Sequence, residues 1–174
     1  MEPPPFGFCK RFRVPILLVP THAISCCYKE RLCAFLGVLK RNKERHRVRV
    51  LWQLAPGLPP AAADADLLRQ VLHTIATNAL QAMPEGGTLA LSTRAASLPR
   101  GRRMLEISLT DSGVGIAAHQ LRHAFTAPRS TKPDGMGIGL PLVARTLERL
   151  GGAISVSSTQ GHGTRVCLSL PVSA

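Results

Sequence analysis

The chain has 174 residues, of which 45% are hydrophobic, which is enough for one sizeable core and too little for a second independent domain. Its formal net charge is +12, with 11 Lys/Arg against 3 acidic residues in the first 50 positions and 11 against 7 in the remainder. Scattered bases are typical of a solvated surface, so we expect no nucleic-acid partner, and no apolar run approaches the ~20 residues that span a bilayer.

The first 45 residues differ in composition from the rest. They hold four of the five cysteines, without the paired Cys-x-x-Cys spacing of a zinc site, which indicates free thiols in a reducing, cytoplasmic compartment. Residues 1–45 also carry prolines and bases without a helical period. Two hypotheses compete for this segment: a divergent or artefactual start, which the composition favours, or a true extension that docks on something anionic.

A strand and a helix begin the regular part of the chain. Apolar and polar residues alternate from Arg47 to Leu54, which predicts a strand, and Pro56–Pro60 ends it. Asp64 then has the residue type of a helix N-cap, and Pro84–Gly87 is a stop signal. Between them apolar residues recur at three and four positions, as on one helix face: Leu67, Leu68, Val71, Leu72, Ile75, Ala79, Leu80 and Met83.

Two more strand patterns follow the helix. Thr88–Ala95 and Met104–Thr110 are separated by a turn that contains Pro99 and Gly101, which predicts an antiparallel hairpin. The next stretch, Ala117–Asp134, is basic and has no strong period, so we predict no regular element there.

A second helix and a second hairpin complete the chain. We predict a helix from about Ile138 to Leu150, closed by two glycines, and a hairpin of Ala153–Ser158 with Gly163–Val172. The order is therefore strand, helix, two strands, helix, two strands. Such an order is typical of an α/β sandwich with its helices on one face, and not of a doubly wound parallel sheet.

Two glycine-rich stretches and one asparagine predict a nucleotide pocket. Asp111–Ile116 places a carboxylate beside two glycines, where an acceptor can meet a base edge and bare backbone lets a ring approach. Gly135–Leu140 opens a helix, whose free N–H groups and dipole suit phosphate. The amide oxygen of Asn78 can hold the metal that accompanies a triphosphate.

Each of these features has an ordinary alternative when it is taken singly. Asp and Gly dominate turns, a helical Asn is more often exposed or capping, and Thr164 is a good strand former. Gly135–Leu140 resembles a dinucleotide fingerprint, but no strand immediately precedes it. The joint arrangement favours the pocket.

Several blocks of this sequence occur in the order and spacing of one family: Asp64–Met83, Asp111–Ile116, Phe125 with Ser130–Lys132, Gly135–Leu140 and Gly161–Thr164. They resemble the N box, first glycine box, F box and lid, second glycine box and terminal box of a sensor histidine kinase catalytic domain. That family shares its superfamily with gyrase, the mismatch-repair ATPase and the ninety-kilodalton chaperone. For residues 46–174 the resemblance implies an α+β fold, a two-layer α/β sandwich of the Bergerat type. Its mixed, mostly antiparallel sheet would have about five strands, covered on one face by about three helices.

The resemblance also implies roles for individual residues. Asp111 would accept the adenine amino hydrogen, and Thr164 would complete the base contact. Asn78 would coordinate Mg²⁺ between the phosphates, and Lys132 would neutralise the γ-phosphate, so both are expected catalytic residues. The expected ATP-binding set is Asn78, Ala82, Asp111, Gly113, Gly115, Ile116, Thr131, Lys132, Gly135, Gly137, Ile138, Gly139, Leu140 and Thr164.

The sequence departs from the family pattern at two places in the pocket. Thr74 stands where many of these kinases carry a first asparagine, and its shorter side chain predicts weaker contact with metal or phosphate. In the lid only Phe125 is aromatic, which predicts a weaker anchor for lid docking.

The phosphoacceptor motif of these kinases is also missing. None of the six histidines is followed by an acid and then by an Asn-Pro pair: His22, His46, His73, His119, His123 and His162. The resemblance therefore implies a histidine-containing dimerisation domain in cis of a longer protein or in trans, and a response regulator as partner.

Two alternatives to a histidine kinase remain open. One is a module that binds nucleotide without transferring phosphate, and the other is an anti-sigma-type serine kinase or ATPase of the same superfamily. A gyrase-like ATPase is disfavoured, because the helix from Leu67 to Met83 has no Asp or Glu to activate water.

Overall fold

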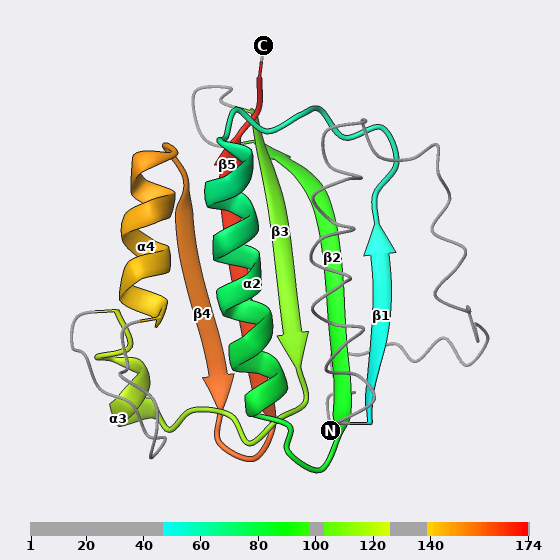
Figure 1. The fold of residues 1–174 in the computed structure, drawn as a ribbon, viewed down its shortest axis with the longest axis vertical. Coiled ribbons are helices and arrows are strands. Elements are labelled where there is room, and N and C mark those ends of the chain that lie inside the picture. Colours follow the sequence, from blue (N-terminus) through cyan, green and yellow to red (C-terminus); the bar gives the residue numbers. More distant parts are fainter. Residues whose placement is uncertain (1–46, 98–102, 126–138, 174) are drawn as a thin grey trace.

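A computed structural model describes residues 47–97, 103–125 and 139–173 of the chain. In this part of the chain a five-stranded sheet is covered on one face by the helices (Figure 1). The strands are β1 (Val48–Leu54), β2 (Gly87–Ser97), β3 (Arg103–Asp111), β4 (Ala153–Thr159) and β5 (Gly163–Pro171), and the helices are α2 (Ala65–Gln81), α3 (Ala118–Leu121) and α4 (Gly139–Arg149).

The sheet is mixed, with strand order β1-β2-β3-β5-β4. The β1–β2 pair, connected through α2, is parallel, and the other three pairs are antiparallel. The two predicted hairpins, β2–β3 and β4–β5, are confirmed, and so is the α+β sandwich.

Helix α2 forms for the reasons that its sequence indicates. The Asp64 carboxylate accepts hydrogen bonds from the backbone N–H groups of Asp66 and Leu67, at 2.9 and 3.0 Å, and so caps the first turn. Its apolar stripe then faces the sheet, and the helix ends at Gln81 before Pro84. The predicted N-cap is confirmed.

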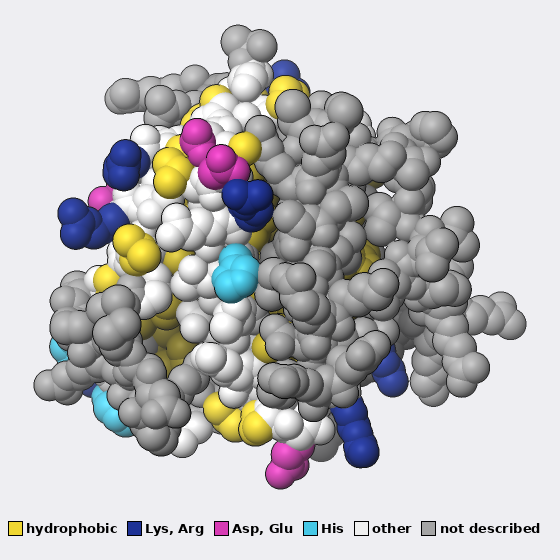
Figure 2. Space-filling view, in the orientation of Figure 1, with side chains coloured by type: hydrophobic (Ala, Val, Ile, Leu, Met, Phe, Trp, Pro, Cys, Tyr) yellow, Lys and Arg dark blue, Asp and Glu magenta, His cyan; other side chains and the backbone are white. Residues whose placement is uncertain are grey.

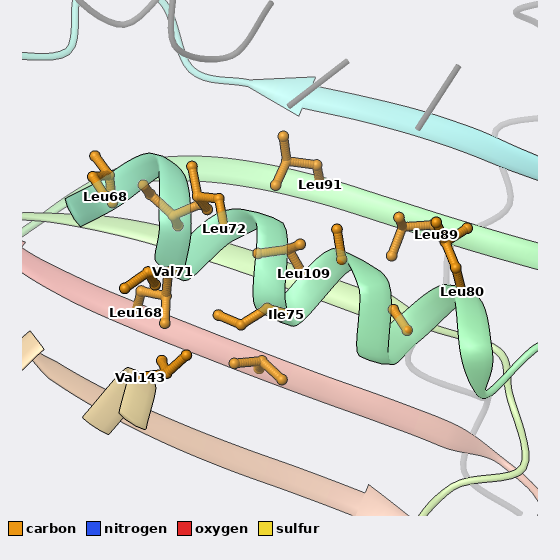
Figure 3. Packing of buried hydrophobic residues seen from close by; sticks show 14 of the residues in the cluster. Leu68, Val71, Leu72, Ile75, Leu80, Leu89, Leu91, Leu109, Val143 and Leu168 are labelled. Atoms are coloured by element: carbon orange, nitrogen blue, oxygen red, sulfur yellow. The ribbon is translucent and has the colours of Figure 1, made fainter. Parts of the chain in front are cut away.

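The core lies between α2, α4 and the sheet. Figure 3 shows Leu72, Ile75 and Leu80 of α2 directed toward Leu109 of β3 and Leu89 of β2. Burial of each such side chain contributes about 1.5–3 kcal/mol, so this layer holds α2 against the strands. Within the residues that the structure describes, no helix combines the length and apolar content needed to span a membrane.

Two local predictions differ from the structure. Strand β2 continues to Ser97, two residues beyond the predicted end, because its pairing with β3 extends to Ser97 opposite Arg103. A short helix, α3, lies in a stretch where no element was predicted. One helical turn shows too few residues for a period, so its sequence carries little signal.

Several chain segments reach the same end of the sandwich. The end of β3, the C-terminus of α2, the start of α4 and the β4–β5 hairpin all lie at the lower end in Figure 1. Segments separated by up to about 80 positions in the sequence therefore share one edge of the sheet. The predicted pocket residues that the structure describes come from this edge.

Candidate functional site

Three polar residues form a row across the sheet at this edge. Asp111 of β3 lies opposite Thr164 of β5, and Thr164 lies opposite Ser158 of β4. Because directly opposed residues point to the same face, the three side chains lie together on the helix-covered side. Along β4, Ser158 continues the inward positions of Ile154 and Val156.

Asp111 is the buried acidic residue of the row, with 7% of its surface exposed. Its Oδ1 accepts hydrogen bonds from the backbone N–H groups of Gly113, at 2.9 Å, and Thr164, at 3.2 Å. Both donors orient the carboxylate and offset part of its desolvation. A buried acceptor with a defined orientation suits recognition of a ligand donor group.

The glycine-rich loop after Asp111 is attached to the C-terminus of α2. The Val114 N–H donates to the Ala82 carbonyl at 3.0 Å. A Cβ on Gly113 would lie 2.5 Å from that same carbonyl oxygen, which is closer than any side chain allows. Glycine at 113 is therefore required by the close approach of two backbones.

Two serine hydroxyls connect the same loop to the sheet. The Ser112 hydroxyl accepts from the Thr88 N–H at 2.9 Å and so joins the loop to β2. The Ser158 hydroxyl accepts from the Ile116 N–H at 2.8 Å, which joins the loop to β4. Neither serine was among the predicted site residues. For Ser158 the signal was present, since it occupies an inward position in an alternating strand.

Asn78 and the start of α4 lie next to each other at the same edge. A Cβ built on Gly139 would be 3.5 Å from the Asn78 amide nitrogen and 3.3 Å from the Thr74 methyl carbon. The Thr74 hydroxyl instead donates to the Gln70 carbonyl at 2.9 Å, within α2. Thr74 therefore presents its methyl group, and Asn78 its amide, to the first residue of α4.

Figure 2 shows apolar surface set back between the start of α4 and α2, on the face that the helices cover. The half-buried Leu140 belongs to α4 at this point. A recess with apolar walls and a few oriented polar groups is typical of small-molecule sites.

Part of the predicted site lies outside the described residues: Thr131, Lys132, Gly135, Gly137 and Ile138. The structure brings the other predicted residues to one edge: Asn78, Ala82, Asp111, Gly113, Gly115, Ile116, Gly139, Leu140 and Thr164. The predicted domain segment 1–45 is likewise outside the described ranges.

The residues present would fit a magnesium ion only if most of its ligands came from a bound ligand and from water. In the described part of the chain, no three His, Cys, Asp or Glu side chains gather in a way that could hold a metal. Mg²⁺ commonly keeps several waters and takes one or two protein oxygens plus phosphate oxygens. The Asn78 side-chain amide could supply one such oxygen, because its O and N can exchange places by rotation.

Comparison with known proteins gives one consistent answer. The model of the family "Histidine kinase-, DNA gyrase B-, and HSP90-like ATPase" matches residues 63–174. Sensor histidine kinase ZraS of Escherichia coli O157:H7 is 42% identical over 115 residues, which cover 66% of this chain and 24% of that protein. The chain thus spans about a quarter of the length of this curated relative.

Two solved structures show the same architecture. Full-length ShkA, in complex with AMPPNP, superposes with a TM-score of 0.70 at 26% identity, covering 87% of this chain and 31% of ShkA. The catalytic domain of histidine kinase ThkA gives a TM-score of 0.70 at 20% identity, covering 83% of this chain and 91% of that domain. At 20% identity the match to ThkA shows a shared fold and nothing further.

Proposed function

The chain belongs to the family of histidine kinase-, DNA gyrase B- and HSP90-like ATPases, as a histidine-kinase catalytic domain, and from this premise we propose its reaction. Residues 46–174 bind ATP and transfer its γ-phosphoryl group to a histidine on a dimerisation domain, within a two-component system. That domain acts in cis of a longer protein or in trans, and a response regulator receives the phosphoryl group.

One observation carries the proposal: Asp111 with Thr164, and Asn78 with the start of α4, lie at the same edge of the sheet. Asp111 and Thr164 are joined by a hydrogen bond of 3.2 Å on β3 and β5. Asn78 adjoins the first residue of α4. A nucleotide with its base on the first pair would extend its phosphates toward Asn78 and the N-terminus of α4, where free N–H groups favour anions.

The residue roles follow from this placement. Asp111 accepts from the adenine amino group, and Thr164 completes the base contact. Gly113 and Gly115 let the loop pack against the backbone carbonyls of Ala82 and Thr159, and Ala82 and Ile116 lie beside the base. Mg²⁺, when bound, neutralises charge on the phosphates, and Asn78 would hold it.

The family resemblance supplies the remaining roles in the pocket. Lys132 and Thr131 contact the terminal phosphate, and Gly135, Gly137 and Ile138 extend the phosphate site that Gly139 and Leu140 begin. In-line phosphoryl transfer depends on positioning and charge stabilisation, so this domain needs no protein nucleophile of its own. The histidine of the dimerisation domain is the nucleophile.

A second candidate is a nucleotide-binding module without transferase activity. The engagement of the Thr74 hydroxyl with the Gln70 carbonyl favours it, because Thr74 then offers its methyl group on the phosphate side. With fewer polar contacts on the phosphate side, the domain would stabilise the phosphoryl group less in the transition state. Binding of the adenine base would be affected less.

A transfer assay separates these functions. The full chain is mixed with ATP labelled at the γ-phosphate and with an isolated histidine-bearing dimerisation domain. Acid-labile label on that domain supports the kinase, nucleotide binding without label supports the module, and release of free phosphate alone supports an ATPase. Lys132→Ala should reduce transfer more than ATP affinity, and transfer unchanged by that substitution would remove its assigned role.

A further inference from the structure

A serine outside the proposed nucleotide contacts lies beside the base-binding pair. Ser158 is the direct cross-strand neighbour of Thr164, which in turn neighbours Asp111. Its hydroxyl oxygen is 2.8 Å from the Ile116 N, 2.8 Å from the Gly163 carbonyl oxygen and 2.9 Å from the Thr164 hydroxyl oxygen. One hydroxyl therefore connects the glycine-rich loop, the start of β5 and the Thr164 side chain.

These three contacts determine which hydroxyl donates. An amide N–H can only donate and a carbonyl can only accept, whereas a serine hydroxyl has a single hydrogen and two lone pairs. Ser158 therefore accepts from Ile116 and gives its one hydrogen to Gly163. The third contact can then be a hydrogen bond only if Thr164 donates its own hydrogen to the Ser158 oxygen.

The hydroxyl of Thr164 is then an acceptor toward any ligand. Its hydrogen is directed at Ser158, so only oxygen lone pairs remain for a group on its other side. The Asp111 carboxylate beside it is an acceptor too, since its Oδ1 accepts from two backbone N–H groups. Two acceptors directed at the exocyclic group at position 6 of a purine match the two hydrogens of a 6-amino group and oppose the lone pairs of a 6-oxo group.

We propose that Ser158 is a specificity-determining positioning residue, which holds Thr164 as an acceptor and thereby makes the pocket prefer a 6-amino purine over a 6-oxo purine. Ser158 acts through Thr164 and needs no contact with the nucleotide. The inference rests on the proposed ATP-binding function and adds to it the origin of base selectivity.

Inosine triphosphate is the matched probe, because it differs from ATP by a 6-oxo group and a protonated N1 in place of the 6-amino group. Affinities of the full chain for ATP and inosine triphosphate are measured by displacement of a fluorescent ATP analogue. The ratio of the two dissociation constants reports selectivity and cancels any general weakening of the pocket.

Ser158→Ala should reduce this ratio by about 3- to 10-fold, the usual effect of one hydrogen bond. Without Ser158 the Thr164 hydroxyl can rotate, donate to the 6-oxo group and cease to be a fixed acceptor. Ser157→Ala is the matched control, because it makes the same change one residue away at an exposed position on the opposite face of β4. The control should keep the wild-type ratio.

A second pair of variants guards against misfolding of the alanine variant. Ser158→Thr keeps the hydroxyl and Ser158→Val removes it at nearly the same volume, and both residue types are favourable in strands. The threonine variant should retain the ratio and the valine variant should lose it. In a Thr164→Val background, where no hydroxyl is left to orient, Ser158→Ala should leave the ratio unchanged.

Three outcomes are decisive. If wild type prefers ATP and Ser158→Ala or Ser158→Val retains that preference, the inference is wrong and the proposed function stands. If the ratio falls equally in both Thr164 backgrounds, Ser158 acts through the general fold and the inference is also wrong. If wild type binds neither nucleotide, the proposed function fails, and the inference fails with it.

Discussion

The two parts of the candidate site are built differently. On the base side, Asp111, Thr164 and Ser158 belong to three neighbouring strands, and hydrogen bonds of 3.2 Å from Thr164 to Asp111 and 2.9 Å between Thr164 and Ser158 join them. On the phosphate side, Asn78 and Gly139 belong to two helices, which adjoin through side-chain packing.

This difference indicates that the two sides of the site are positioned by different means. Strand ladders hold their members in a fixed register, so the base side is positioned before a ligand arrives. In the proposed function, the phosphate side would depend on a helix terminus and on a magnesium ion that arrives with the nucleotide. We therefore expect damage on the base side to affect folding as well as binding, and damage on the phosphate side to affect binding in a magnesium-dependent way.

The largest effect is expected from Gly115→Ala. Gly115 has φ = +67°, and an added Cβ would collide with the Thr159 carbonyl. The free energy of unfolding should fall by about 3 kcal/mol or more, measured by denaturant unfolding. Gly161→Ala is the control, since its φ is +80° with nothing within 4 Å, and it should cost only about 1–2 kcal/mol. Equal losses in the two variants would contradict the close approach.

Asp111→Asn should have the next largest effect. An amide can present a donor where the base requires an acceptor, and the charge that strengthens the hydrogen bonds is lost. ATP affinity should fall by about 10- to 100-fold in a titration with a fluorescent analogue. Asp66→Asn makes the same change at an exposed residue paired with Arg69, and it should leave the affinity unchanged. Unaltered affinity in Asp111→Asn would remove the base contact from the proposal.

Asn78→Ala tests the phosphate side. Its ATP affinity should fall by about 10-fold with Mg²⁺ and stay near wild type when the metal is chelated, because only the metal-bound state uses the amide. Gln70→Ala, an exposed amide on the same helix, serves as the control and should bind like wild type under both conditions. A loss of equal size without Mg²⁺ would show that Asn78 contributes to the fold or contacts the nucleotide directly.

The smallest effect is expected from Thr74→Val. Valine keeps the methyl group near Gly139 and removes the hydroxyl that donates to the Gln70 carbonyl. Magnesium-dependent ATP affinity should change by less than about 2-fold, since that hydroxyl is engaged inside the helix. A drop comparable to that of Asn78→Ala would instead make Thr74 a ligand of the metal or phosphate.

Much of the fold follows from local patterns. The cap at Asp64, the apolar stripe of α2 and the two hairpins were predictable, because each is encoded in side chains close together in the chain. The short helix α3 was not, because four residues do not display a period. The continuation of β2 to Ser97 depends on its partner strand, which local alternation does not reveal.

The sequence by itself determined the parts of this protein: the helices that carry an apolar stripe, the hairpins, and the motifs that resemble a nucleotide-binding domain. Only the tertiary structure decided which parts meet. Cross-strand register, which arises from pairing between distant segments, placed Ser158 beside Thr164 and Thr164 beside Asp111. The Thr74 hydroxyl differs from these, because its partner is the Gln70 carbonyl one turn earlier in the same helix, and the sequence does not state which of two rotations that hydroxyl takes.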